Sequence, residues 1–255
     1  MIRSIRTLQE KSRQRKKEKA FVVEGCQEVK LALQSGFAAK TLLICPEFFG
    51  TETIKLPLKA DCIEVTPEVY RKLAYRDSTE GIIAVFESKA CDLSSLSTLT
   101  DTPLYLVAEA PEKPGNIGAL LRTADAAGID ALLIINPKTD IFNPNTIRSS
   151  VGTVFTIPIA TGTIPEIVRF LRKQQCTIFG AALDNAVSFT DQNYLSASAI
   201  VVGTESTGLT SELLDQTDVI IKIPMLGQVD SLNVSVAASI LVYEARRQRN
   251  LSGEF

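Results

Sequence analysis

The 255-residue sequence contains no histidine and no tryptophan, and its five cysteines are scattered. Without histidine, proton transfer near neutral pH must use carboxylates, Lys, Arg, Tyr, Cys or solvent. The cysteines never form a C-x-x-C pair, so we expect no zinc or other metal site. Their odd number and wide spacing predict reduced, mostly buried thiols. The five are Cys26, Cys45, Cys62, Cys91 and Cys176.

Long hydrophobic runs are also missing. No apolar run approaches the roughly 18–20 residues that a membrane-spanning helix requires. The N-terminal stretch MIRSIRTLQEKSRQRKKEKA is basic but lacks the apolar segment of a secretory signal. We therefore expect a cytoplasmic protein that does not associate with a membrane. Apolar residues make up 45% of the chain, which allows a substantial core without disulfides or metal.

Positive charge is concentrated at the N-terminus. Residues 1–20 hold eight Lys and Arg residues, Arg13, Arg15, Lys16 and Lys17 among them, against two Glu, a net charge of +6. The whole chain carries −2, so the remaining residues carry −8. A basic segment on an otherwise acidic chain indicates a polyanionic partner that is contacted locally. A solvated basic helix with no partner is the alternative.

The first ninety residues predict a small α/β unit. One of its helices is expected to begin with Thr66 as N-cap and Pro67 at the first helical position. The stretch CDLSSLSTLTDTP is rich in Ser and Thr and predicts a linker, so we place a domain boundary at residues 90–103. The predicted domains are residues 1–95 and 103–255. The predicted strands of the first domain are AFVVEG, KTLLIC, CIEV and GIIAVFES, with a helix at CQEVKLALQSG.

From Pro103 onward, short apolar runs alternate with helical patterns. Near-continuous apolar strands separated by helices indicate a parallel sheet that is covered on both faces. The predicted strands are LYLVAEA, ALLIIN, VFTIPIA, CTIFGAAL, AIVVGTE and DVIIKIPM, and the predicted helices are NIGALLRTADAAG, NPNTIRSSVG, IPEIVRFLRKQQ, TSELLDQT and a closing helix.

The first of three polar loops, EAPEKPGNIGALLRTADAAGID, follows the strand LYLVAEA. Arg122 is predicted at the edge of the buried stripe, in the second turn of a helix that starts at a strand's carboxyl end, where ligands of open α/β sheets bind. The alternative is that Asn116 caps the helix and Arg122 is a surface charge. The GNIG fragment lacks the full G-x-G-x-x-G of a dinucleotide site. The buried stripe itself is Ile117, Leu120, Leu121 and Ala124.

The second loop, IVVGTESTGLTSELL, passes from a buried strand through Gly203, Glu205 and Gly208 into a helix. Glycines permit a ligand to approach the backbone closely, and a carboxylate can accept hydrogen bonds from a bound molecule. A tight strand-to-helix turn with an exposed Glu205 explains the same residues without a ligand.

The third loop, IIKIPMLGQVDSLNVSVAAS, leads from a strand into the closing helix. An N-cap at Ser231 or Asp230 would explain one polar residue. Ser231, Asn233 and Ser235 together exceed what capping requires, and polar groups at the start of a buried helix need partners. Either a ligand or neighbouring loops can supply them.

The order and spacing of these loops resemble the three signature motifs of the SpoU (TrmH) family in the SPOUT superfamily. That family consists of S-adenosylmethionine-dependent RNA ribose 2′-O-methyltransferases. The resemblance covers residues 103–250, and the first ninety residues resemble the ribosomal-protein-like substrate-binding domain that many members carry. The matching motifs are N-x-G-x-x-x-R-T-A (Asn116–Ala124), G-x-E-x-x-G (Gly203–Gly208), I-P-M (Ile223–Met225) and S-L-N-V-S-V-A (Ser231–Ala237).

The resemblance implies an α/β fold in which a parallel-sheet trefoil-knot methyltransferase domain follows a small α/β RNA-binding domain. It implies that S-adenosylmethionine binds to backbone groups of Gly203, Ile223 and Leu232, with Thr204, Met225 and Leu226 as neighbours. It also implies that Arg122 activates the ribose hydroxyl or removes its proton, positioned with the ribose by Asn116, Glu205, Ser231 and Asn233. Family members are homodimers in which this arginine acts beside the other subunit's cofactor.

Ribosomal RNA is the expected substrate, ahead of transfer RNA, because the chain carries a separate N-terminal domain. The expected RNA contacts are Arg13, Arg15, Lys16 and Lys17. Three alternatives stay open: a tRNA 2′-O-methyltransferase, a catalytically inactive knotted RNA-binding module, and an α/β enzyme of another nucleotide. The missing G-x-G-x-x-G argues against the last.

Overall fold

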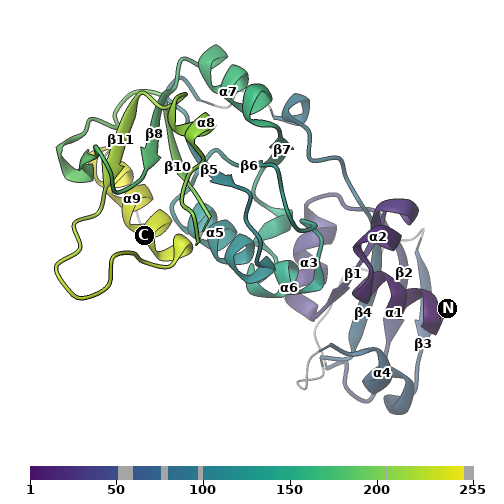
Figure 1. Cartoon of the computed structure of the whole chain (residues 1–255). Coiled ribbons are helices and arrows are strands. Elements are labelled where there is room, and N and C mark those ends of the chain that lie inside the picture. The colour runs from purple at the N-terminus through teal and green to yellow at the C-terminus, as the bar shows by residue number, and fades with distance from the viewer. Residues whose placement is uncertain (51–59, 76–79, 97–99, 205, 250–255) are drawn as a thin grey trace. The chain divides into compact units, whose positions relative to one another are not determined.

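The structure, a computed structural model, describes residues 1–255 except 51–59, 76–79, 97–99, 205 and 250–255 (Figure 1). The chain divides into two compact units. Unit 1 consists of Met1–Ala90 together with Asp140–Thr156, and unit 2 consists of Cys91–Thr139 together with Ile157–Phe255. A segment from the carboxy-terminal half of the sequence is therefore part of the amino-terminal unit.

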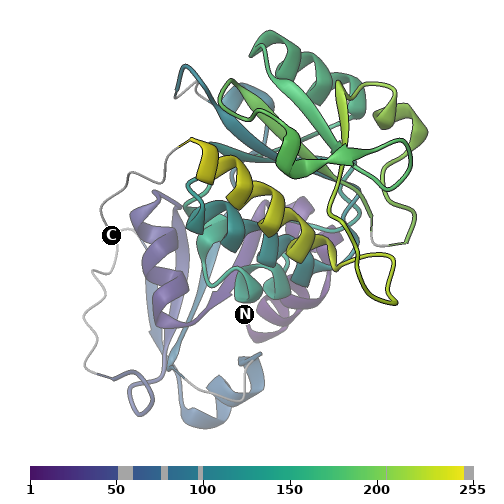
Figure 2. The ribbon, with the colours of Figure 1, turned by 90° about the vertical axis from the view of Figure 1, so that its left-hand side faces the viewer.

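Unit 1 is built on a four-stranded mixed sheet with the strand order β1-β4-β2-β3. The strands β1 and β2 both run antiparallel to β4, and β2 runs parallel to β3. Figure 2 shows the unit from a second direction. Its elements are α1 (Ile2–Glu10), α2 (Ser12–Glu18), β1 (Ala20–Glu24), α3 (Cys26–Gln34), β2 (Ala39–Ile44), β3 (Asp61–Glu64), α4 (Pro67–Leu73), β4 (Ile82–Glu87), α6 (Pro144–Ser149) and the short 3-10 turn η2 (Thr153–Phe155).

One face of this sheet packs against α1 and α4, and their apolar side chains form one core. Helix α4 begins where the sequence predicts, because the Thr66 side chain accepts a hydrogen bond from the backbone of Val69 at 3.4 Å and Pro67 follows it. The predicted N-cap is thus confirmed. The buried residues of this core are Ile5, Leu8, Ala20, Val22, Leu43, Cys45, Tyr70, Leu73, Ile83 and Val85.

The segment Asp140–Thr156 completes unit 1 with aromatic rings and an ion pair. The Phe142 ring stacks on Phe21 with 4.4 Å between ring centroids, and Phe155 lies 5.8 Å from the same ring. The Arg15 guanidinium pairs with Asp140 at 2.5 Å. Phe21, Phe142 and Phe155 are all buried. This segment therefore contributes to the core of the unit, and burial of its rings stabilises the N-terminal fold.

Unit 2 contains a seven-stranded sheet, and every strand pairing in it is parallel, as predicted. The strand order is β7-β6-β5-β10-β8-β11-β9. Its elements are the short 3-10 turn η1 (Leu93–Ser95), β5 (Leu104–Glu109), α5 (Pro114–Ala126), β6 (Ala131–Ile135), β7 (Ile159–Gly162), α7 (Ile164–Lys173), β8 (Thr177–Ala181), β9 (Val187–Ser188), the short 3-10 turn η3 (Phe189–Asp191), β10 (Ser198–Val202), α8 (Ser211–Leu214), β11 (Val219–Lys222) and α9 (Val234–Gln248).

Helices cover both faces of this sheet (Figure 1). Apolar residues of α7 and Leu213 of α8 pack on alternate strand positions such as Val107 and Leu133. Because side chains alternate along a strand, the intervening positions face the other side. There α5 and α9 pack against each other, and the hydroxyls of Thr123 and Ser239 lie 2.8 Å apart.

Within the described ranges, no helix is long and apolar enough to cross a membrane. Nor does any group of three or more His, Cys, Asp or Glu side chains among the same residues form a potential metal site. None of the five cysteines forms a disulfide. Cys26, Cys45 and Cys176 are buried, Cys91 is half-buried and Cys62 is exposed, and burial raises the pKa of Cys176 to about 11. Cys176 is therefore a neutral thiol at physiological pH.

Candidate active site

Three separate segments of unit 2 meet around an open pocket of about 170 Å³. They are the β5–α5 connection, the loop that follows β10, and the first residue of α9. Strands β5 and β10 are parallel neighbours, so their carboxyl ends lie at the same edge of the sheet, the usual position of ligands in such folds. The lining residues are Ala108, Pro111, Glu112, Lys113, Asn116, Leu120, Gly203, Thr204, Ser206 and Val234.

The loop after β10 folds back tightly on itself, and this requires glycine at position 203. The backbones of Thr204 and Gly208 exchange two hydrogen bonds, of 3.0 and 3.2 Å. A Cβ atom on Gly203 would collide with the backbone of Gly208 and Leu209. Glu205, the predicted catalytic carboxylate of this loop, lies outside the described residues.

A carboxylate that the sequence interpretation missed connects this loop to β5. Glu109, the last residue of β5, is buried and accepts hydrogen bonds from the Thr210 backbone at 2.8 Å and from the Thr210 hydroxyl at 2.6 Å. Thr210 is also the N-cap of α8. Glu109 thus holds the end of the loop against the strand that leads into α5. Its signal in the sequence was a single carboxylate at the end of an otherwise apolar strand.

The polar residues at the start of α9 differ in their hydrogen bonds and exposure. Asn233 is the N-cap, because its side-chain oxygen accepts hydrogen bonds from the Ser235 backbone at 2.9 Å and the Ser235 hydroxyl at 2.6 Å. A cap at Ser231 or Asp230 would have explained one of these polar residues, but neither caps α9: the helix begins two or three residues later than such a cap requires, and both side chains are exposed. The Asn233 amide also donates to Asn116 at 3.5 Å, which links the third motif to the first.

Arg122 lies in the third turn of α5, one turn later than expected, because the helix starts at Pro114 rather than at Asn116. Its side chain is exposed and makes no hydrogen bond or ion pair with the residues that the structure describes. It is not among the residues that line the pocket. A guanidinium in this state is available to a substrate or to a second chain.

The segment between β11 and α9 carries the other predicted cofactor residues, and it forms a long open loop (Figure 1). Ile223 and Met225 are half-buried, whereas Leu226 is 98% exposed and Leu232 is 37% exposed. None of these four lines the pocket; among the predicted cofactor residues, Gly203 and Thr204 do. Cofactor contacts from this loop stay a prediction.

Of the four basic residues predicted to contact RNA, three are exposed on α2: Arg13, Lys16 and Lys17. Arg15 is not accessible. Only 2% of its surface is exposed, and its guanidinium donates to Leu8 O at 2.7 Å and Gln9 O at 3.0 Å besides pairing with Asp140. This burial does not fit an RNA contact, and we assign Arg15 to the core of unit 1.

Comparisons with known proteins match both parts of the chain. The SpoU rRNA Methylase family matches residues 103–243, and the MRM3-like substrate binding domain matches residues 1–84. A relative from Bacillus subtilis, 23S rRNA (guanosine(2553)-2′-O)-methyltransferase RlmP, is 32% identical over 234 residues, which cover 92% of this chain and 91% of the relative.

Solved structures agree with this match. An AdoMet-bound rRNA methyltransferase from Sinorhizobium meliloti has a TM-score of 0.87 at 29% identity and covers 96% of this chain and 94% of its own. The SpoU methyltransferase AviRb from Streptomyces viridochromogenes, in complex with AdoMet, also has a TM-score of 0.87, at 26% identity. The match covers 99% of this chain and 98% of AviRb. The predicted fold class and family are confirmed: this chain belongs to the SpoU rRNA Methylase family.

Proposed function

We propose that this protein transfers a methyl group from S-adenosylmethionine to the ribose 2′-hydroxyl of one nucleotide in ribosomal RNA, in the cytoplasm. The observation that carries the proposal is the pocket at the carboxyl ends of β5 and β10, because residues of all three motifs meet there. The relatives support it further, since their names specify 2′-O-methylation of 23S rRNA.

The lining of this pocket fits the cofactor. Ala108, Leu120 and Val234 offer apolar surface for an adenosine, and Glu112 and Lys113 offer charges to an amino-acid group. Gly203 has no side chain, so the loop backbone packs closely on Gly208 and Leu209, and in this conformation Gly203 and Thr204 line the pocket. When bound, S-adenosylmethionine supplies a sulfonium methyl that passes to the hydroxyl oxygen, with the thioether as leaving group. We retain Ile223, Met225, Leu226 and Leu232 as proposed contacts from the loop before α9.

Around that methyl donor, the protein has to hold the ribose hydroxyl about 3 Å away and accept its proton. Arg122 is a poor base, because a guanidinium keeps its proton in proteins. We therefore assign Arg122 to orienting the hydroxyl and an adjacent phosphate, and the proton passes late in the reaction to that phosphate or to solvent. Asn116 and Asn233, which are hydrogen-bonded to each other, position the ribose side of the site together with Ser231 and Glu205.

We further propose a homodimer in which Arg122 reaches the pocket of the partner subunit. Arg122 does not line its own pocket, and apolar side chains remain exposed on α9 near the site. Val236 is 47% exposed and Tyr243 is 42% exposed. The two residues are seven positions apart on α9, about two helical turns, so they lie on the same face. An interface on this face would bury both of them.

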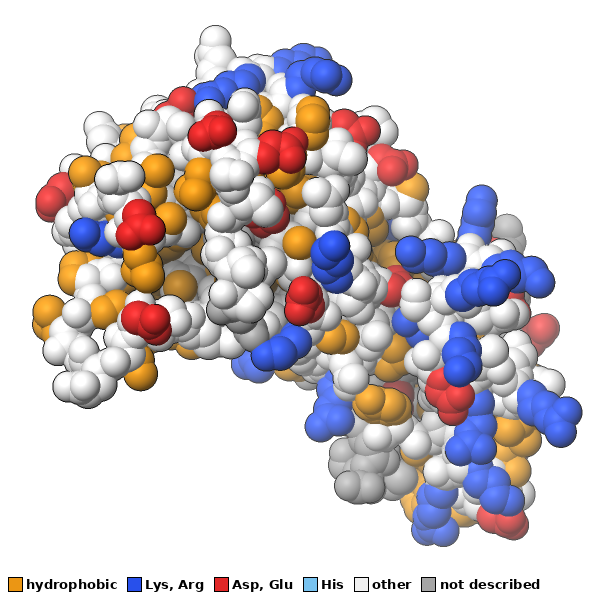
Figure 3. Space-filling view, viewed as in Figure 1, with side chains coloured by type: hydrophobic (Ala, Val, Ile, Leu, Met, Phe, Trp, Pro, Cys, Tyr) orange, Lys and Arg blue, Asp and Glu red, His pale blue; other side chains and the backbone are white. Residues whose placement is uncertain are grey.

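We also propose that the two domains have different functions: residues 1–95 bind RNA, and residues 103–255 form the knotted methyltransferase domain. Lys and Arg side chains gather over α1, α2 and α4 in Figure 3. Arg13, Lys16 and Lys17 are exposed there, whereas Arg15 is buried. Exposed basic side chains bind RNA by neutralising phosphates and releasing counterions. This support is electrostatic and does not specify a sequence.

Methyl transfer to RNA that lacks one hydroxyl tests the proposal. Incubation with S-adenosylmethionine and ribosomal RNA should give a 2′-O-methylated nucleoside at one position, detected by mass spectrometry of the digested RNA. A fragment with a 2′-deoxy group at that nucleotide should accept no methyl group, while a deoxy group at a neighbouring nucleotide should not prevent the reaction. Methylation of the fragment that lacks the 2′-hydroxyl at the target nucleotide would show a base methyltransferase, and transfer to tRNA alone would exclude the ribosomal substrate.

Gly203→Ala should weaken S-adenosylmethionine binding by about tenfold or more. The new methyl group collides with the backbone of Gly208 and Leu209, so the loop has to open, and overpacking of this kind costs about 1–3 kcal/mol. Isothermal calorimetry measures the affinity. Gly115→Ala is the matched control, because a Cβ at that position in α5 meets nothing within 4 Å. If the two variants bound S-adenosylmethionine with equal affinity, the loop after β10 would not be part of the cofactor site.

A further inference from the structure

Unit 1 holds an exposed aromatic ring that is fixed at both ends. Tyr75 follows α4, and 48% of its surface is exposed. Its backbone N–H donates to the Glu24 carboxylate at 2.7 Å, and its hydroxyl donates to the Asn145 side chain at 3.0 Å. A tyrosine so exposed normally rotates freely, whereas here the ring keeps one orientation with part of its surface open to solvent.

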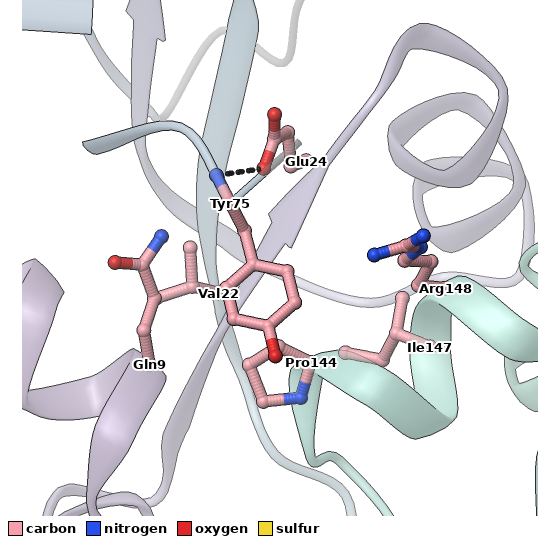
Figure 4. A pocket seen from close by; sticks show the side chains of 7 residues that line it. All are labelled: Gln9, Val22, Glu24, Tyr75, Pro144, Ile147 and Arg148. Carbon is pink, nitrogen blue, oxygen red and sulfur yellow. Dashed lines mark hydrogen bonds between the residues drawn. The ribbon is translucent and has the colours of Figure 1, made fainter. Parts of the chain in front are cut away.

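A small pocket surrounds this ring (Figure 4). Val22 and Ile147 are buried and form an apolar floor with Pro144. The Tyr75 ring lies between Gln9 on one side and Arg148 on the other. The enclosed volume is about 20 Å³, room for about one water molecule. The pocket is therefore too small to enclose a planar ligand, which would have to lie across its mouth against the tyrosine.

Polar groups flank the ring. The Arg148 side chain, in the last turn of α6, is exposed and has no hydrogen bond or ion pair among the described residues. One amide N–H of Gln9 donates to Leu73 O at 2.7 Å, which fixes the amide at the pocket edge. The surroundings are basic: residues 1–90 hold 16 Lys and Arg against 12 Asp and Glu, and Asp140–Thr156 adds one of each, which gives unit 1 a net charge of +4.

We propose that this pocket binds one unpaired nucleotide of the RNA substrate, with its base stacked on Tyr75 and a phosphate on Arg148. The proposal rests on the proposed function only for the identity of the ligand as RNA. Every base has a π face, so stacking on a fixed ring tolerates different sequences, and an arginine beside it anchors the backbone. Bases within a duplex are already stacked, so the pocket favours single-stranded or looped RNA.

The test is the affinity of the full chain for a fluorescein-labelled oligouridylate, measured by fluorescence anisotropy. Tyr75→Leu should weaken binding by about tenfold, the usual contribution of one base stack. Tyr75→Phe loses only the hydroxyl that donates to Asn145 and should stay within about threefold of wild type. A duplex of the same length should bind with an affinity that Tyr75→Leu leaves unchanged.

Arg148→Gln provides a second, independent measurement. It should weaken oligouridylate binding and lower the slope of log affinity against log salt by about 0.7, the loss of one phosphate contact on a single strand. Arg169→Gln is the matched control, because Arg169 is an equally exposed arginine on α7 of unit 2; its slope should not change. Thermal midpoints within a few degrees of wild type would show that these variants remain folded.

Wild-type affinity in Tyr75→Leu, or no binding of the oligouridylate to wild type, would overturn this proposal. Failure of the proposed function is a separate result. It would appear as a wild-type chain that binds no S-adenosylmethionine in calorimetry and methylates no RNA, whatever Tyr75→Leu does to RNA affinity. Conversely, normal rRNA methylation with an unchanged Tyr75→Leu affinity would refute the nucleotide pocket alone.

Discussion

Replacing Arg122 with alanine should lower methyl transfer by about a hundredfold or more, because the ribose hydroxyl loses the group that orients it and misplacement of a reacting group costs about that factor. Binding of S-adenosylmethionine should stay within about threefold of wild type, because Arg122 is exposed and does not line the pocket of its own chain. Single-turnover methylation of ribosomal RNA and calorimetry with the cofactor measure the two effects separately. Arg169→Ala, another exposed arginine, should leave both unchanged.

The same variant tests the proposed dimer. If Arg122 acts on the partner's pocket, a mixture of Arg122→Ala and Gly203→Ala chains contains heterodimers with one intact composite site. At a cofactor concentration too low to saturate Gly203→Ala, such a mixture should be more active than either variant alone. No recovery after subunit exchange, verified by mass spectrometry, would place Arg122 within its own chain. Loss of cofactor binding in Arg122→Ala alone would give the residue a structural role.

Arg15→Ala should destabilise unit 1 by about 3–5 kcal/mol, because it removes the charged donor of a largely buried carboxylate and of two backbone carbonyls. Arg15 is 2% exposed and its partner Asp140 is 11% exposed, so solvent screens this ion pair very little. The two groups lie far apart in the sequence, and their pairing joins α2 to the segment Asp140–Thr156. Urea unfolding followed by circular dichroism measures the change.

Arg13→Ala is the matched control on the same helix. Arg13 is exposed, so its removal should change the free energy of unfolding by less than about 0.5 kcal/mol. It should weaken RNA binding instead and flatten the salt dependence. If the two variants were equally stable, the ion pair between Arg15 and Asp140 would not support unit 1 as described.

The sheet of unit 2 could be predicted because its central strands β5, β6 and β10 are buried on both faces. Residues 104–108 of β5 and 199–202 of β10 are continuously apolar and buried. One apolar run was interpreted wrongly. VFTIPIA was predicted as a single strand, but Val154 and Phe155 form a 3-10 turn in unit 1, and the strand β7 starts only at Ile159. Apolar composition indicates burial, and it does not reveal which of two cores a residue joins.

The burial of Arg15 could not be predicted for the same reason, because a local sequence pattern does not show which distant residues pack around a side chain. A buried arginine and an exposed one give the same pattern in a basic helix, and only the position of Asp140, far along the chain, distinguishes them. The site was predictable where a motif required a particular residue, as at Gly203. It was not predictable where a partner is distant, as for Glu109 and Thr210, whose two hydrogen bonds join parts of the sequence that no local pattern relates.

Hydrogen–deuterium exchange with and without S-adenosylmethionine tests most directly that the three motif segments form one cofactor site. The cofactor should slow exchange in all three together, at residues 108–116, 203–210 and 223–234, with little change in unit 1. Calorimetric binding accompanied by protection of only one segment, or of none, would contradict a shared pocket and the catalytic arrangement built on it.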